Sequence, residues 1–295
     1  MIDLSGLADD PRHKLAVFDI DGTILDHAHA PQSVIAGIRH LHTLGVVTTV
    51  STGRSFRRVK DLLGPVFDDL ISSDALLVVE HGSKVVDRAG KVIAADYLKG
   101  NELDHVVAFT EANLHIIDHL RFCSPDPSAD MQVWCAKPEH VADVAETLRA
   151  KGYHAQVFSS SPRELRKRLG RAKPTNVSAK LKDYVKVENL KLHFTRSSID
   201  SIFQDGILEF VRSIADKGRA IRAIEKHYGV PVKYMLIAGN AINDVDMLSL
   251  PAGSRVLVGT DEDAAAILPF IEGRELVIRV ADPAELGRYL SGRSY

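Results

Sequence analysis

The chain has 295 residues, of which 45% are hydrophobic, and its formal net charge at pH 7 is −2. A chain of this length can bury one large core or two moderate ones, and the nearly balanced charge argues against bulk binding to nucleic acid. Because no apolar run is long enough to span a membrane and residues 1–12 lack an apolar signal core, we expect a cytoplasmic protein, either a monomer or a homodimer. Only Cys123 and Cys135 are present, so we expect free buried thiols and no disulfide framework.

Predicted strands and helices alternate over the first eighty residues. The apolar run at residues 15–18 has no polar alternation, which is typical of a strand covered on both faces. The expected strands are residues 15–18, 46–50 and 75–79, and the expected helices run from Pro31 to Gly45 and through Val59, Leu62 and Leu63. This order predicts an α/β fold built on a Rossmann-like, doubly wound parallel sheet.

The middle of the chain changes character and predicts a separate α+β unit. Residues 84–93 resemble a hairpin with a Gly-containing turn. The further expected elements are a helix from Asn101 with Leu114 and Ile117 on its apolar side, a strand at 131–136, a helix from Pro138 to Gly152, and strands at 153–158 and 189–195. We expect residues 1–98 and 206–295 to form the core, and residues 99–205 to be inserted into it, with a return to the core at 207–211.

Strand and helix alternation resumes in the last part of the chain. The expected elements are a helix carrying Ala220, Ile221 and Ile224, strands at 234–238, 255–258 and 276–280, and a final helix that starts at Asp282. Asp282 has Pro and Glu at the positions that favour a helix start.

Two carboxylates, Asp19 and Asp21, stand where the first predicted strand ends, and Gly22 permits a tight bend. Ligands of open α/β sheets bind just outside the carboxyl ends of the strands. Two adjacent negative charges are costly unless a cation or a reaction justifies them, which favours a divalent metal and a carboxylate nucleophile. The alternative is a solvated turn, because Asp-x-Asp alone is a common pattern.

Three later stretches lie at other predicted element ends. Ser51-Thr52-Gly53-Arg54 follows the second strand, Asp216-Lys217-Gly218 precedes a helix, and Gly239-Asn240-Ala241-Ile242-Asn243-Asp244 follows a later strand. The turn at Gly53 would expose backbone N–H groups to an anion. Taken singly, Thr-Gly-Arg is explained equally well by a turn that ends a strand, and a lone lysine near a helix start is more often an ordinary solvated side chain. The order of the stretches along the chain is the informative feature.

With these four motifs the sequence resembles the haloacid dehalogenase superfamily of aspartate-nucleophile phosphotransferases. More narrowly it resembles the Cof-type and sucrose-phosphatase-like subclass, which has a large cap inserted in the second half of the core. The resemblance implies that residues 99–205 are this cap and that the enzyme is a Mg²⁺-dependent phosphatase. Its implied substrate is a small anionic phosphorylated metabolite, most often a sugar phosphate.

The resemblance also implies roles for individual residues. Asp19 corresponds to the nucleophile and Asp21 to the general acid and base, while Thr52, Gly53 and Lys217 correspond to the phosphate-binding groups. The implied metal ligands are Asp19, Asp21, Asn240 and Asp244, with Asn243 in support. Asn240 departs from the pattern because the family usually has an acid there; an amide oxygen can ligate Mg²⁺ but brings no charge.

Two features are left with alternative interpretations. Residues 163–186 hold nine Lys and Arg against two acids, which indicates either a solvated face or a patch attracting an anionic substrate. His81 is either a turn residue or a substrate contact. A phosphomutase and a non-catalytic phospho-ligand binding protein are the competing functions; the presence of both Asp19 and Asp21 speaks against the latter, and Asn240 speaks for it.

Overall fold

The computed structural model describes residues 14–122, 131–150, 155–174, 176–181, 199–204, 207–212 and 216–292. Residues 1–12, Cys123 and the strand expected at 189–195 lie outside this part of the chain. The chain divides into two compact units, one made of Met1–Ala94 with Asp216–Tyr295 and the other of Ala95–Ala215. Among the described helices, none combines the length and hydropathy that crossing a bilayer requires.

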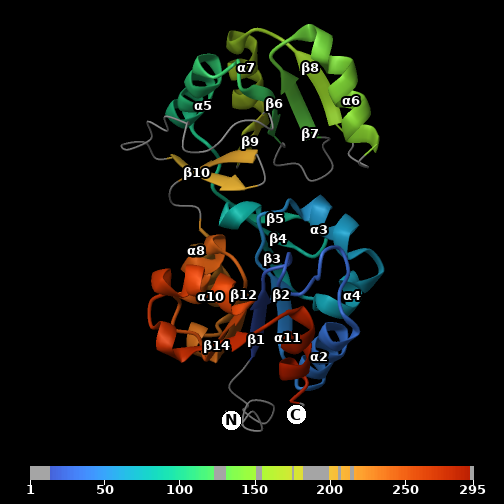
Figure 1. Ribbon diagram of the computed structural model, residues 1–295, viewed down its shortest axis with the longest axis vertical. Coiled ribbons are helices and arrows are strands. Elements are labelled where there is room, and N and C mark those ends of the chain that lie inside the picture. Colours follow the sequence, from blue (N-terminus) through green and yellow to red (C-terminus); the bar gives the residue numbers. More distant parts are fainter. Residues whose placement is uncertain are drawn as a thin grey trace. The chain divides into compact units, whose positions relative to one another are not determined.

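The first unit contains a parallel five-stranded sheet in the order β14-β13-β12-β1-β2 (Figure 1). Its strands are β1 (Leu15–Phe18), β2 (Val47–Val50), β12 (Met235–Gly239), β13 (Ser254–Val258) and β14 (Val277–Val280). In register, Phe18 lies between Val50 and Ala238, so the carboxyl ends of the three central strands coincide. The expected doubly wound parallel sheet is therefore confirmed.

Helices cover both faces of this sheet. They are α2 (Gln32–Thr43), α3 (Phe56–Leu63), α4 (Phe67–Leu70), α8 (Lys217–Tyr228), α9 (Val245–Leu248), α10 (Asp261–Ile267) and α11 (Pro283–Leu290). Side chains alternate along β1, so Ala16 and Phe18 pack with α2, α3 and α11, whereas Leu15 and Val17 pack with α8, α9 and α10. This two-sided burial explains why residues 15–18 show no polar alternation.

Two glycines allow α2 and α11 to approach closely. A Cβ at Gly37 would lie 2.6 Å from the carbonyl oxygen of Gly287, and a Cβ at Gly287 would lie 2.3 Å from the amide nitrogen of Val34. Real Cβ atoms do not reach such distances, so both positions require glycine for close helix packing.

A small antiparallel sheet, β3-β4-β5, completes the first unit. Its strands are β3 (Leu76–Val79), β4 (Lys84–Asp87) and β5 (Val92–Ala95), which agrees with the predicted hairpin. A single parallel bridge from Ser51 to Val78 joins β3 to the end of β2. The tight turn η2 (Glu80–Gly82) between β3 and β4 is thereby held beside the turn that follows β2.

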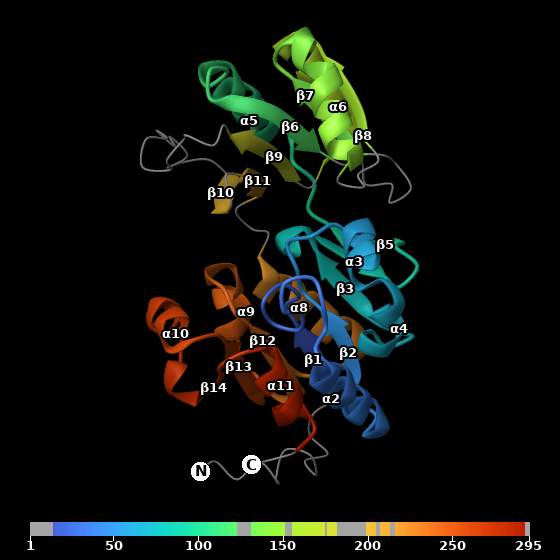
Figure 2. The same ribbon diagram turned by 45° about the vertical axis from the view of Figure 1, so that its right-hand side comes forward.

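The second unit has a six-stranded sheet in the order β10-β11-β9-β6-β7-β8 (Figure 2). Its strands are β6 (Ile117–Phe122), β7 (Met131–Cys135), β8 (Ala155–Ser159), β9 (Asn176–Leu181), β10 (Ile199–Gln204) and β11 (Ile207–Arg212), and its helices are α5 (Gly100–Ala112), α6 (Val141–Ala150) and α7 (Pro162–Ala172). Trp134 and Phe122 pack with Leu165 of α7, whereas Cys135 packs with Val144 and Leu148 of α6 and is a free buried thiol. The expected α+β unit is present.

Two sequence expectations in this region are wrong. The helix expected to include Leu114 and Ile117 ends at Ala112, and Ile117 starts strand β6; three- and four-residue spacing of apolar side chains continued by chance across the turn. The expected return to the core at residue 206 is also wrong, because Ile207–Arg212 pairs antiparallel with β9 and β10 in the second unit. The unit therefore ends at Ala215, after this strand.

Candidate active site

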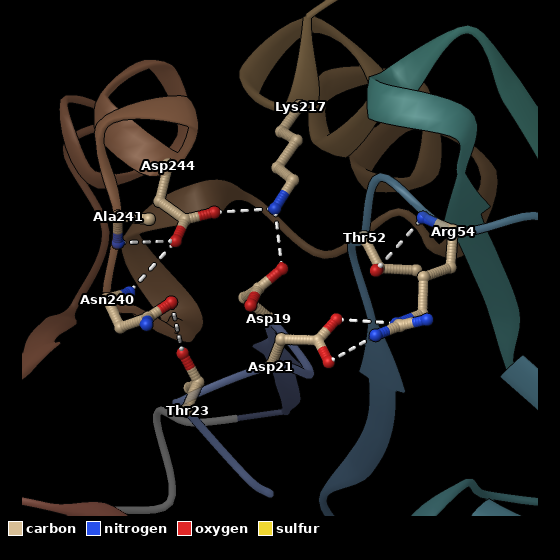
Figure 3. A network of polar contacts seen from close by, with 9 residues as sticks. All are labelled: Asp19, Asp21, Thr23, Thr52, Arg54, Lys217, Asn240, Ala241 and Asp244. Atoms are coloured by element: carbon tan, nitrogen blue, oxygen red, sulfur yellow. Dashed lines mark hydrogen bonds and ion pairs between the residues drawn. The ribbon is translucent and has the colours of Figure 1, made fainter. Parts of the chain in front are cut away.

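The predicted site residues gather at the carboxyl ends of the central strands in the first unit (Figure 3). Asp19 follows β1, Thr52 follows β2, Asn240 follows β12, and Lys217 is the first residue of α8. Figure 3 shows the Asp19 carboxylate between Lys217 and Asp21. Asp19 and Asn240, more than 200 positions apart, come together because the parallel strands β1 and β12 end at the same edge of the sheet.

A buried lysine joins two carboxylates at the centre of the site. Lys217 Nζ donates to Asp19 Oδ1 at 2.6 Å and to Asp244 Oδ1 at 2.6 Å. Lys217 is 1% exposed, Asp19 6% and Asp244 0%. Buried charges persist only when they are paired and hydrogen-bonded, so these three side chains form one electrostatic unit.

The loop after β12 fixes Asp244 in this unit. Asp244 Oδ2 accepts the backbone N–H groups of Asn240 at 2.9 Å and of Ala241 at 3.0 Å. A Cβ at Gly239 would lie 2.7 Å from Cβ of Asp244, so glycine is needed where the loop folds back. Both oxygens of Asp244 are therefore engaged, one by the lysine and one by the loop backbone.

Burial and the attraction between opposite charges have opposing effects on the pKa of each central group, and both pKa values lie above their usual values. Burial raises the pKa of Asp19 to about 7; Lys217 opposes this shift and Asp244 adds to it. Burial alone would lower the pKa of Lys217, but the two carboxylates outweigh it and raise the pKa above its usual value. Lys217 is therefore a permanent cation, while Asp19 is held near the boundary between its protonated and ionised forms.

Asp21 is turned toward a different partner, Arg54. The Arg54 Nε and Nη2 atoms donate to the two Asp21 carboxylate oxygens at 2.6 and 2.7 Å (Figure 3). The pair is partly exposed, with side-chain exposures of 44% for Asp21 and 32% for Arg54. Sequence reasoning missed a role for Arg54, although it stands directly after the predicted phosphate turn.

Asn240 lies against the turn that carries Asp21. Its Oδ1 accepts a hydrogen bond from Thr23 Oγ1 at 3.3 Å, and a Cβ at Gly22 would lie 2.2 Å from its Nδ2. Gly22 also has a positive φ of 75°, so glycine satisfies two requirements there. Thr23 is a second site residue that sequence reasoning missed, because a buried threonine after Asp-Gly carries no signal of its own.

The predicted phosphate turn at Thr52 and Gly53 is tight and closely packed. Thr52 Oγ1 accepts the backbone N–H of Arg54 at 3.2 Å, and Thr52 is buried. His81 covers Gly53 so closely that a Cβ there would lie 2.3 Å from the His81 ring. The backbone N–H of His81 also donates to the carbonyl of Thr52 at 3.1 Å, so η2 supports this turn.

The turn η2 connects the phosphate turn to Lys217. Glu80, His81 and Gly82 have successive positive φ values of 53°, 56° and 88°, which is costly for the two non-glycine residues. A Cβ at Gly82 would lie 2.2 Å from the carbonyl oxygen of Asp216. The buried ion pair of Glu80 with Lys84, 2.7 Å long, closes the turn.

The predicted supporting residue Asn243 lies on the loop after β12, and Asp246 lies on α9. Asn243 Oδ1 is buried and has no hydrogen-bond partner among the described residues. Asp246 is exposed on α9, in line with a solvent-facing position. In the second unit, part of the predicted basic segment has structural partners, since Arg166 pairs with Asp104 and Arg168 stacks 4.1 Å from the centroid of the Phe158 ring.

The oxygen donors at the site fit Mg²⁺. Within the described residues no cluster of three or more His, Cys, Asp or Glu has a metal-binding arrangement. Mg²⁺, however, is usually held by one or two protein oxygens together with waters and substrate phosphate. The Asp19 carboxylate and the Asn240 amide oxygen are hard donors of this kind on adjacent loops (Figure 3), whereas Asp21 and Asp244 are bonded to cations and backbone amides.

Comparison with a protein-family model decides the family. Residues 16–265 match the model of the haloacid dehalogenase-like hydrolases. The chain belongs to this family. The match spans both segments of the first unit, so the predicted superfamily, its Rossmann-like fold and its phosphatase class are confirmed, and the second unit is the cap.

Curated relatives and solved structures agree with this assignment. The chain is 25% identical over 254 residues to an HMP-PP phosphatase of Cronobacter sakazakii, covering 83% of this chain and 84% of that protein. An HMP-PP phosphatase of Serratia proteamaculans is 24% identical over 269 residues, with 88% and 89% covered. A phosphatase of the haloalkanoate (HAD) enzyme superfamily from Bacteroides thetaiotaomicron has the same fold, with a TM-score of 0.70, 17% identity and coverage of 96% and 95%. A HAD subclass IIB sugar phosphatase gives a TM-score of 0.69 and 19% identity, with 94% and 96% covered.

Proposed function

We propose that this hydrolase is a Mg²⁺-dependent phosphatase of a small phosphorylated metabolite, with a sugar phosphate as the substrate class. It acts through an aspartyl-phosphate on Asp19. The observation that carries the proposal is the buried contact of Asp19 with Lys217, 2.6 Å long, at the carboxyl end of β1. A nucleophile that must approach a phosphate dianion requires a fixed positive charge beside it.

The first step transfers the phosphoryl group to the enzyme. A carboxylate oxygen of Asp19 attacks phosphorus and forms a new P–O bond while the bond to the ester oxygen breaks. The leaving oxygen takes a proton from Asp21 and departs as an alcohol. Lys217 and the N–H groups of the Thr52–Gly53 turn balance the charge on the equatorial phosphate oxygens.

The second step returns Asp19 to its carboxylate form. A water oxygen attacks phosphorus, its proton passes to Asp21, and the P–O bond to Asp19 breaks to release inorganic phosphate. The proton lost by Asp21 in the first step is regained here, so the cycle balances. An aspartate at position 21 serves both steps, which is why we propose hydrolysis.

Asp19 and Asn240 would hold the metal ion, which supplies charge neutralisation of the phosphate when bound. The ligand roles predicted for Asp21 and Asp244 remain predictions. In this structure the oxygens of these two carboxylates bind Arg54, Lys217 and backbone amides. Asp244 contacts Lys217 and would orient it, and Asn243 remains a candidate supporting residue.

The substrate class rests on relatives. One structural neighbour is named a sugar phosphatase and two curated relatives are named HMP-PP phosphatases, and all of these substrates are small phosphorylated molecules. We therefore propose a panel of sugar phosphates, sugar-acid phosphates, phosphoglycolate and HMP-PP, with released phosphate measured at saturating Mg²⁺ and in EDTA.

The panel has defined outcomes. Phosphate release from at least one member that requires Mg²⁺ and disappears in Asp19→Asn supports the proposal. Binding without release would favour a non-catalytic protein. Phosphoryl transfer between positions of a sugar, activated by a sugar bisphosphate and without net release, would favour a phosphomutase.

A further inference from the structure

We propose that Arg54 is a positioning residue for Asp21, which it holds in the orientation that accepts a proton from the attacking water. This inference rests on the proposed function, since it assigns how one part of that site works. It goes beyond the predicted roles, in which Asp21 acts alone and Arg54 has none.

The contact has the geometry of a clamp. Arg54 presents two N–H groups, one to each Asp21 oxygen, at 2.6 and 2.7 Å. A planar guanidinium that matches both oxygens fixes the plane of the carboxylate as well as its distance. Each carboxylate oxygen has two lone pairs, so one lone pair on each oxygen remains for water.

Asp21 needs such a clamp because of its location. Its side chain is 44% exposed, and a half-exposed aspartate without a partner rotates freely among its rotamers. Asp19, two residues earlier, is held by Lys217 in the buried centre. The two carboxylates of one turn therefore depend on two different cations for their orientation.

Arg54 is itself fixed by the phosphate turn. Its backbone N–H donates to Thr52 Oγ1, and its carbonyl accepts the N–H of Glu80 at 3.0 Å. The backbone of Arg54 is thus tied to the residues proposed to bind the phosphoryl group. The Arg54 residue thus links the turn that carries Thr52 to the Asp21 carboxylate (Figure 3).

A double-mutant cycle separates positioning from direct substrate binding. Arg54→Met, Asp21→Asn and the double variant are compared with p-nitrophenyl phosphate, whose activated leaving group needs no proton. The burst of p-nitrophenol reports formation of the phosphoenzyme, and the steady rate after it reports hydrolysis. Two sites that act as a unit are not additive in such a cycle.

We expect Arg54→Met to slow hydrolysis of the phosphoenzyme by roughly 10- to 100-fold, as for loss of charge-assisted hydrogen bonds, while kcat/KM, which reports only the steps up to phosphoenzyme formation, changes less than about twofold. In the Asp21→Asn background the same substitution should cost less than about threefold. Arg54→Lys keeps the positive charge but lacks the planar pair of N–H donors, so we expect it to slow hydrolysis of the phosphoenzyme nearly as much as Arg54→Met does.

Three results would overturn the inference. The first is that Arg54→Met slows hydrolysis as much in the Asp21→Asn background as in the wild type. The second is a higher KM with no slower hydrolysis, which would make Arg54 a substrate-binding residue. The third is hydrolysis at the wild-type rate in Arg54→Met or Arg54→Lys. Failure of the proposed function is distinct, because the wild-type enzyme would then show neither burst nor phosphate release.

Arg39 provides a matched control. It also donates through Nε and Nη2 to an aspartate, Asp69, at 3.0 and 2.8 Å, but on the exposed surface of α2. Arg39→Met should leave both burst and hydrolysis at the wild-type level. Equal thermal midpoints for Arg39→Met, Arg54→Met and Arg54→Lys would show that differences in hydrolysis are not due to unfolding.

Discussion

Replacing Lys217 with methionine tests the electrostatic unit at the centre of the site. The lysine is 1% exposed and is bonded at 2.6 Å to both Asp19 and Asp244. Methionine keeps the length of the side chain but leaves two buried carboxylates without a cation. Removing one partner of a buried ion pair costs about 3–5 kcal/mol, and with a urea m-value of about 2 kcal/mol/M the unfolding midpoint falls by about 1.5–2.5 M.

Two optical probes locate this loss in one unit. The single tryptophan, Trp134, is buried in the second unit, so its fluorescence follows that unit, whereas far-ultraviolet circular dichroism follows both. We expect Lys217→Met to shift the dichroism transition of the first unit and to leave the fluorescence transition in place. Adding Asp19→Asn to the same chain should restore part of the loss, because it removes one buried charge.

Lys226→Met is the control, because it makes the same replacement on an exposed position near the end of the same helix. It should cost no more than about 0.3–1 kcal/mol. If Lys217→Met lowered the midpoint by no more than Lys226→Met, the three groups would not form a buried ion-paired unit, and this account of the site would be refuted.

Three further predictions concern the metal, pH and the turn η2. Asn240→Asp should lower the Mg²⁺ concentration that gives half-maximal activity, because an anionic oxygen replaces a neutral one; an unchanged value would place residue 240 outside the coordination shell. In EDTA, the free energy of unfolding should decrease as pH rises from about 4 to about 7, because Asp19, with its pKa raised from 3.8 to about 7, keeps a proton in the folded protein that it loses in the unfolded chain. The Asp19→Asn variant should lack this slope, and a slope that survived in it would belong to other groups. Gly82→Ala should destabilise more than Gly45→Ala, because both glycines have positive φ but only the Cβ at Gly82 would meet the Asp216 carbonyl, at 2.2 Å. A urea midpoint for Gly82→Ala equal to or above that of Gly45→Ala would contradict this.

The core and the placement of its motifs were predictable from the sequence because their signals are local. The apolar run at residues 15–18 indicates a buried strand, and the Asp-x-Asp-Gly sequence that follows shows where this strand ends. Parallel order then brings Asp19, Thr52 and Asn240 to one edge without further information. Lys217 was identified only through the family resemblance, because a lone lysine at the start of a helix carries no signal of its own.

The side-chain partners at the site were not predictable, because they depend on orientation. Asp244 was expected at the metal, yet one of its oxygens binds Lys217 and the other binds two backbone N–H groups. Asp21 was expected beside the reacting groups, and its bidentate contact with Arg54 depends on the path of the turn after β2. Neither contact leaves a periodic pattern in the sequence.

The cap was less predictable for a related reason. Its sheet combines strands from distant segments, so Ile207–Arg212 gave an apolar run that fits a core strand as well as a cap strand. Ile117 continued the spacing of α5 across a turn although it belongs to β6. Apolar periodicity identifies buried residues, but it does not say which sheet or helix buries them.

Trapping the phosphoenzyme is the most direct test of the central claim that Asp19 is the nucleophile. Wild-type enzyme, Asp21→Asn and Asp19→Asn are mixed with p-nitrophenyl phosphate and Mg²⁺, quenched in acid and digested, and the phosphorylated peptide is identified by mass spectrometry. We predict a phosphoryl group on Asp19 in the wild type, more of it in Asp21→Asn because its hydrolysis is slowed, and none in Asp19→Asn. A phosphoryl group on any other residue, or its persistence in Asp19→Asn, would contradict the mechanism.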